Sequence, residues 1–325
     1  MDDRLGLDGR YSPMAQRLIC LAGASWSFDV ASQRLEELCG LEVSDTTVRE
    51  VSQRHGALML AWQRDDPRAA EDFRQAQGDV EFTTDGTSVN TTEGWREMKV
   101  GIFSKRDRAE AALPAEWDSR TLPVPKVRVC FAAIEHSERF GSRWKAWRSR
   151  LGLLATSTIS VLADGAKWIW EEQCRHLTYA EGVLDIFHAL EHVAATAKAL
   201  SEDPSQQAAW TDAGRTALLT AGWSGIVQHV EQSASPELSP SAQAALRALL
   251  DYFAPHTLHL AYAQRLAEGR SIGSGQVEGA CKNLIGRRLK QTGARWRVRR
   301  VNRMAGLCSI MYSHQWDAYW TTLTT

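Results

Sequence analysis

Five β-rich runs, confined to the middle of the chain with helical sequence on both sides, constrain the fold of this protein most strongly. The runs cover residues 79–84, 95–103, 127–134, 158–163 and 182–187, and a basic helical segment at 137–151 separates the third run from the fourth. The first three runs can pair antiparallel as neighbours. The pattern therefore predicts an α/β fold with a mixed sheet.

Two helical stretches surround these strands. Residues 31–39 have helical apolar spacing and stop at Gly40, and a second helix opens at Ser44 or Asp45. This spacing predicts a helix-turn-helix module over 1–60, with a plain helical hairpin as the alternative. The boundaries that we expect are a linker at 61–77, a catalytic core at 78–189, a helical insertion at 190–270 and the closing part of the core at 271–325.

Composition excludes several classes of protein. The 325 residues carry 38 Lys and Arg against 39 Asp and Glu, so the net charge is −1 and a polycation or an acidic tail is excluded. The six cysteines form no CxxC pair, which favours reduced thiols in a cytoplasmic protein. The first residues do not resemble a signal peptide, and no apolar run has the length of a membrane span.

Two of the β-rich runs end in Asp-Gly. Asp85 follows the first run and Asp164 follows the fourth. Asp-Gly is a common turn dipeptide, but carboxylates at strand ends can also hold a hard divalent cation. The repeated placement makes Asp85 and Asp164 candidate metal ligands at one end of the sheet.

A third carboxylate precedes a strongly basic segment near the C-terminus. Glu278 lies on a helix expected at 274–290, and no acidic residue occurs between Gly279 and Trp316. Lys282 lies one turn after Glu278 and could hold a phosphate beside a metal ion. The alternative is a basic helix docked on an acidic part of the same chain. Our candidates for DNA contacts are Arg287, Arg288, Lys290, Arg295, Trp296 and Arg297 here, together with Thr46, Thr47 and Arg49 in the N-terminal module.

His188-Ala189-Leu190-Glu191-His192 matches the H-x-x-E-H pattern of zinc peptidases with an inverted motif. A peptidase needs a third protein ligand, which the sequence from 200 to 260 does not offer plainly. The other interpretations are packing at a helix start, or a supporting role of His188 beside a nuclease site. The 13 tryptophans, many beside Arg or Lys, pack in the core or offer flat surfaces for stacking on bases.

Several of these motifs together resemble one known family. The runs DGTSV, GWREMKVGIF, ADGAKWIW, LDIFHALEH and IGSGQVEGACKNLIGRRLKQTGARW are similar to those of bacterial insertion-sequence transposases of the ISKra type. These transposases belong to the DDE group, and the resemblance covers about residues 12–315. It implies an RNase H-like catalytic fold with a helical insertion. It also implies a catalytic and metal-binding triad of Asp85, Asp164 and Glu278.

The resemblance further implies two Mg²⁺ ions, for which Mn²⁺ can substitute, and double-stranded DNA as substrate at element ends and target. Synapsis of two ends implies a homodimer or a larger assembly, associated with the bacterial nucleoid. An inactive, transposase-derived DNA-binding protein is the alternative, although all three acids are present. The helix-turn-helix candidate begins about 30 residues into the chain. A shortened member of the family is therefore a further interpretation of this sequence.

Overall fold

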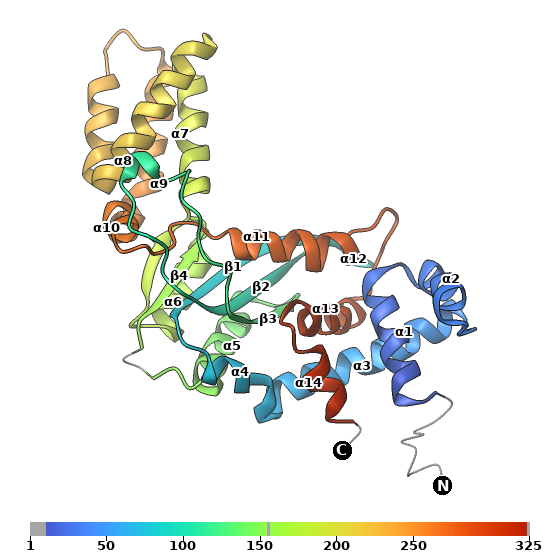
Figure 1. Cartoon of the computed structure of the whole chain (residues 1–325). Coiled ribbons are helices and arrows are strands. Elements are labelled where there is room, and N and C mark those ends of the chain that lie inside the picture. The colour runs from blue at the N-terminus through green and yellow to red at the C-terminus, as the bar shows by residue number, and fades with distance from the viewer. Residues whose placement is uncertain (1–10, 155–156, 324–325) are drawn as a thin grey trace.

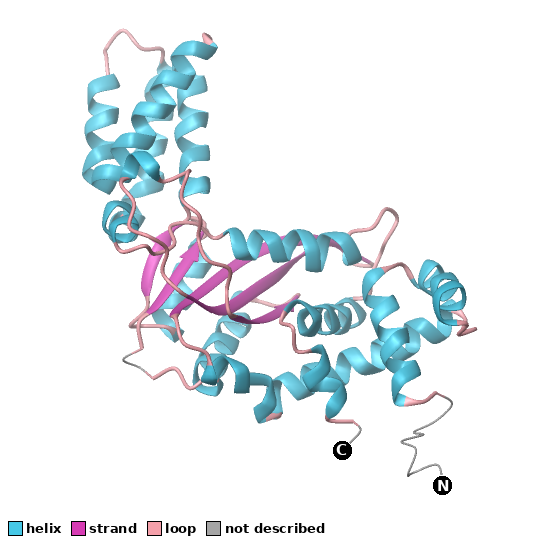
Figure 2. Ribbon diagram, in the orientation of Figure 1, coloured by secondary structure: helices cyan, strands magenta, loops and turns pink. Residues whose placement is uncertain are grey.

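The computed structural model describes residues 11–154 and 157–323 and shows a mixed α/β protein with one five-stranded sheet (Figure 1, Figure 2). The strands are β1 (Asp79–Thr91), β2 (Gly94–Arg106), β3 (Val127–Ala133), β4 (Ile159–Ala163) and β5 (Glu181–Leu184). The α-helices are α1 (Pro13–Ser25), α2 (Phe28–Cys39), α3 (Asp45–Asp65), α4 (Glu71–Gln75), α5 (Ser137–Arg150), α6 (Lys167–His176), α7 (Ile186–Leu200), α8 (Pro204–Ser233), α9 (Pro240–Phe253), α10 (Tyr262–Ala267), α11 (Gly275–Ala280), α12 (Arg287–Leu289), α13 (Val298–Tyr312) and α14 (Trp316–Thr321). Short 3₁₀ segments are η2 (Pro67–Ala70), η3 (Pro114–Glu116) and η4 (Ala254–His259), and η5 (Cys281–Gly286) is π-helical.

The sheet has the strand order β3-β2-β1-β4-β5. The first three strands pair antiparallel, as expected, while β4 runs parallel to both β1 and β5. The mixed sheet is therefore confirmed. The parallel pairs matter for function, because parallel strands bring their carboxyl ends to the same edge of a sheet.

Two strand boundaries differ from the prediction. The first Asp-Gly is not a turn: Asp85 pairs with Val100 inside the hairpin, and β1 continues to Thr91 before the chain turns. At the other edge, β5 stops at Leu184, and α7 begins two residues later because Asp185 caps it. Whether a turn dipeptide forms a turn, and where a short strand ends, depends on the neighbouring strands with which it pairs. The sequence alone does not show which strands are neighbours.

The segment 61–77, expected as a linker, is helical and packed. Helix α3 continues to Asp65, and η2 and α4 follow it directly. Trp62, Ala69 and Phe73 are buried there. The charged residues that indicated a linker occupy the solvent face of these short helices, so 61–77 is a packed helical connection between α3 and β1.

The sheet is covered on both faces. Phe82 and Phe103 on one face pack against Trp144 of α5. On the other face, side chains of β1 and β2 pack against α11, η5 and α13. No helix among the described residues is long and apolar enough to cross a membrane.

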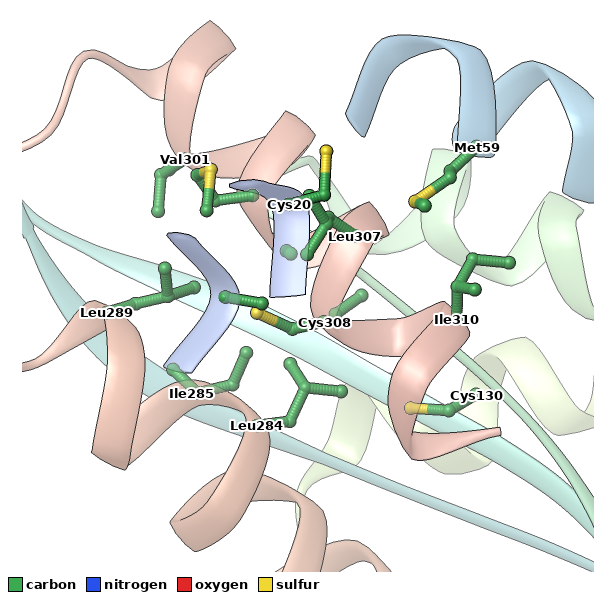
Figure 3. Close-up of a cluster of buried hydrophobic side chains, with 14 of the residues drawn as sticks. Cys20, Met59, Cys130, Leu284, Ile285, Leu289, Val301, Leu307, Cys308 and Ile310 are labelled. Carbon is green, nitrogen blue, oxygen red and sulfur yellow. The ribbon is translucent and has the colours of Figure 1, made fainter. Parts of the chain in front are cut away.

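The N-terminal helices belong to the same core as the sheet. Figure 3 shows Cys20 of α1 and Met59 of α3 beside Leu307 and Ile310 of α13, with Cys130 of β3 at the edge of this cluster. All five side chains are buried. The helices α1 to α3 are therefore joined to the sheet and to α13 by shared packing, and they are not attached as a separate module.

Helices α7 to α10 form a bundle that projects from one end of the sheet (Figure 1). Its own core includes Leu218, Ile226 and Phe253. Helix α8 is kinked at Gly222, whose φ of 56° is in the left-handed region, and a Cβ there would lie 2.7 Å from the Leu260 carbonyl oxygen. The bundle corresponds to the helical insertion expected at 190–270.

Candidate active site at the ends of β1, β4 and β5

The register of the parallel strands sets Asp85 and Asp164 side by side. Thr83 of β1 pairs with Leu162 of β4, and continuing that register by two residues brings Asp85 level with Asp164. Side chains two residues apart share a face of the sheet. Both carboxylates therefore lie on the face that carries α11, at the carboxyl end of β4.

The two carboxylates also influence each other electrostatically. Asp85 is half-buried, and its burial raises the pKa of its carboxyl group, with the charge of Asp164 adding to the rise. The N–H of Gly86, which donates to Asp85 Oδ1 at 2.6 Å, and the nearby His188 act in the opposite direction. A cation beside Asp85 and Asp164 would relieve the repulsion between their two carboxylates.

Asp164 is held in place by the start of α6. Its Oδ1 accepts the N–H of Ala166 at 2.9 Å, and its main-chain carbonyl accepts Nε1–H of Trp170 at 2.9 Å. Its other carboxylate oxygen accepts no hydrogen bond from the residues that the structure describes. This oxygen is available to a metal ion or a substrate.

Sequence reasoning missed a third aspartate at this edge. Ala163 of β4 pairs with Leu184 of β5, so the next residues, Asp164 and Asp185, are also level. Asp185 is fully buried, and it accepts the N–H of His188 at 2.9 Å and the N–H of Ser274. It caps α7 and anchors the loop before α11. The signal was the same strand-end placement of an aspartate, hidden because the strand was expected to extend to 187.

Glu278 lies on α11, which crosses over β1 and β2 (Figure 1). Three residues later, Sγ of Cys281 lies 3.8 Å from Asp85 Oδ2, so the face of the helix that carries Glu278 and Cys281 is turned toward Asp85. Glu278 is half-buried and pairs with Lys282, Nζ to Oε2, at 3.4 Å.

The structure does not join all three predicted acids into one cluster. Among residues 11–154 and 157–323, no three His, Cys, Asp or Glu side chains come together as a group that could hold a metal ion. Asp85 and Asp164 are brought together, and Glu278 is carried on the covering helix. The helix expected at 274–290 is also interrupted by the π-helical η5, a feature often found at functional sites.

The two histidines of the H-x-x-E-H run have different surroundings. Burial disfavours the protonated form of His188, but Asp185, Glu191 and Asp164 outweigh it and raise the pKa of His188. Burial lowers the pKa of His192, whose ring stacks on Tyr252 with centroids 3.6 Å apart. No described side chain joins the two histidines as a third zinc ligand.

The helical insertion reaches this site through Tyr252 of α9, a residue that no sequence motif singles out. A Cβ on Gly165, the residue after Asp164, would lie 2.6 Å from the Tyr252 ring and 3.0 Å from its hydroxyl. That hydroxyl is buried and has no hydrogen-bond partner among the described residues. Burial and the charges of Asp164, Asp185 and Glu191 raise the pKa of Tyr252, so the phenol stays protonated.

The basic segment divides into surface and core residues. Arg287, Lys290, Arg295 and Arg297 are exposed, and Lys290 and Arg295 contact Thr87 and the Thr91 carbonyl of β1. Arg288 and Trp296 are buried, which corrects their expected role in DNA contact. The Arg288 guanidinium donates to the Gly23 carbonyl at 2.6 Å and lies over the rings of Phe28 and Trp296.

The N-terminal candidates lie at the start of α3. Thr46 is exposed, and the N–H of Thr47 donates to the capping hydroxyl of Ser44 at 3.2 Å. Arg49 is half-buried one turn further along. Helices α2 and α3 are joined by a short turn through Gly40, whose φ is 63°.

No protein-family model matches the sequence, and no curated protein matches it either.

Proposed function

We propose that this protein is a metal-dependent DNA transposase of the DDE group. The observation that carries the proposal is the level placement of Asp85 and Asp164 on neighbouring parallel strands, under the helix that bears Glu278. Three antiparallel strands followed by two parallel ones, with helices on both faces, support an RNase H-like core. The α2-turn-α3 pair supports a helix-turn-helix at the N-terminus.

The carboxylates fit a hard divalent cation. Mg²⁺ takes oxygen ligands and keeps several waters, so one or two protein carboxylates suffice for each ion. Asp85 and Asp164 would hold one ion, and Glu278 would share in holding a second. When bound, Mg²⁺ or Mn²⁺ stabilises negative charge on the reacting phosphate oxygens.

Other residues of the site position the catalytic side chains or offer positive charge to the phosphate. Asp185 fixes the start of α7 and the loop before α11, and thereby sets where His188 and Glu278 lie. Lys282 offers a charge to a non-bridging phosphate oxygen, and protonated His188 can do the same. In the first step, water attacks a phosphodiester at the element end and the 3′-oxygen of the element leaves as a free hydroxyl. In the second step, that 3′-hydroxyl attacks a phosphodiester of the target strand, and the 3′-oxygen of the target leaves. Joining two ends requires at least two copies of the chain.

The test is strand cleavage and joining on duplexes taken from the DNA that flanks the gene. The wild-type protein should give Mg²⁺-dependent nicks and joined products, while Asp164→Asn and Glu278→Gln should give neither. Asp212→Asn, an exposed acid on α8, is the matched control and should keep full activity. If the wild-type protein binds these duplexes without cutting them, the alternative of an inactive DNA-binding protein holds.

A further inference from the structure

Two adjoining cavities lie between the N-terminal helices α2 and α3 and the segment 291–303. Their volumes are about 560 and 470 Å³, and they share Arg49, Gln53 and Arg300. They therefore form one continuous depression, which we call the arginine groove. Its basic lining residues are Arg49, Arg54, Arg288, Arg295, Arg297, Arg300 and Arg303.

The arginine groove carries uncompensated positive charge. Its acidic lining residues are Asp29, Asp45 and Glu50 only. None of its arginines forms an ion pair with an acid in the described part of the chain. Arg54 donates to Gln16 Oε1 and Arg295 to the Thr91 carbonyl, and both acceptors are neutral. Clustered guanidinium groups without acidic partners, lining an open depression, favour an extended polyanion.

Direct contacts hold the two walls of the groove together. Gln53 of α3 donates from Nε2 to the main-chain carbonyl of Arg300 in α13 at 3.0 Å. A Cβ on Gly56 would lie 2.3 Å from the Arg303 carbonyl oxygen, so α3 and α13 are in direct backbone contact. Packing therefore sets the spacing of the helices that carry the arginines before a ligand arrives, which lowers the conformational cost of binding.

We propose that the arginine groove binds the phosphate backbone of double-stranded DNA and joins the N-terminal helices and the C-terminal basic segment into a single interface. The first turn of α3, with Thr46 and Arg49, forms one wall, and Arg295, Arg297 and Arg300 form the other. The inference rests on the proposed function for the choice of DNA over RNA.

The aromatic residues of the groove favour a duplex over a single strand. Single-strand sites need exposed rings on which bases stack. Trp296 lines the groove but is 9% exposed, because its ring faces Phe28 at 6.1 Å and the Arg288 guanidinium at 5.2 Å. Phe28, the other ring of the lining, is half-buried, and the Arg288 guanidinium lies 4.6 Å from its ring centroid. The groove therefore offers several charges for phosphates and no fully exposed ring for bases.

The test measures duplex binding against salt concentration in EDTA, so that no cleavage is required. The double variant Arg297→Ala, Arg300→Ala should lower affinity about tenfold or more and reduce the salt slope by about two phosphate contacts. Arg299→Ala is the matched control: this exposed arginine is adjacent in α13 but lines neither cavity. It should change affinity less than about twofold.

The outcomes separate this inference from the proposed function. If Arg299→Ala weakens binding as much as the double variant, the charge is diffuse and the groove is not the site. Tighter binding of single strands or of RNA would also overturn the inference. Asp164→Asn should bind the duplex as the wild type does. A wild-type protein that binds through the groove but never cuts DNA would refute the proposed function and leave the groove intact.

Discussion

The buried carboxylate of Asp185 accepts the backbone N–H of Ser274, 89 residues later in the chain, while its other oxygen accepts the N–H of His188 at 2.9 Å. One side chain thus joins the end of β5, the start of the insertion and the loop that leads into α11. The helix that carries Glu278 is positioned through this contact. The geometry of the candidate site therefore depends on Asp185, which we do not propose as a metal ligand.

Replacing Asp185 by Ala should destabilise the protein by about 2–4 kcal/mol, because two buried N–H groups lose their acceptor. Asp203→Ala is the matched control, since Asp203 caps α8 in the same way but at an exposed position. It should cost about 1 kcal/mol. Denaturant unfolding measures both values, and equal losses would show that Asp185 is not a structural anchor.

The strands could be predicted from the sequence because each is a run of β-branched and aromatic residues. Their ends could not. Asp85-Gly86 is a turn signal by composition, but pairing with β2 continues past it to Thr91. The charges of 61–77 indicated a linker, whereas Trp62 and Phe73 pack into the core. In both cases tertiary contacts outweigh the local signal.

The candidate site was only partly predictable for the same reason. Asp85 and Asp164 stood out as strand-end acids, and register brings them together. Asp185 and Tyr252 become visible only once β4, β5 and α9 are in place. Arg288 and Trp296 look like surface residues in a basic run, yet they stack on one another beneath α2. Sequence shows the charge of a residue but not which side of a helix it faces.

Gly165 and Tyr252 should be energetically coupled. Gly165→Ala places a Cβ against the Tyr252 ring, and overpacking of this kind typically costs about 1–3 kcal/mol. In a Tyr252→Ala background the same substitution should cost much less. A double-mutant cycle on unfolding free energies measures the coupling, expected at about 1 kcal/mol or more. Strict additivity would show that the insertion does not touch the end of β4.

His55 should make stability depend on pH. Burial, assisted by the charge of Arg54, lowers its pKa from 6.5 to about 4. The folded state therefore binds fewer protons than the unfolded state between these values, so stability is full above pH 6.5 and falls as pH drops toward 4. The loss is of the order of 3 kcal/mol.

His55→Gln should remove this part of the pH dependence. The ring of His55 is hydrogen-bonded to the Tyr319 hydroxyl at 2.9 Å and to Gln16 Oε1 at 2.8 Å, and a glutamine in its place has no proton to gain. The difference in unfolding free energy between wild type and variant, measured at pH 7 and pH 4.5, should shrink or reverse at the lower pH. If the difference in unfolding free energy is the same at both pH values, a group other than His55 causes the pH dependence.

Metal binding should depend on Asp164 even when no DNA is present. Asp85 and Asp164 repel each other across neighbouring strands, and a divalent cation between them would relieve that repulsion. Calorimetric titration of the DNA-free protein with Mn²⁺ should show binding that Asp164→Asn weakens at least about tenfold. Because Mn²⁺ and Mg²⁺ both take oxygen ligands, excess Mg²⁺ should compete.

His192→Ala should leave Mn²⁺ binding unchanged, since the ring of His192 stacks on Tyr252. Loss of binding in that variant, with Asp164→Asn unaffected, would shift the metal site to the histidines of α7.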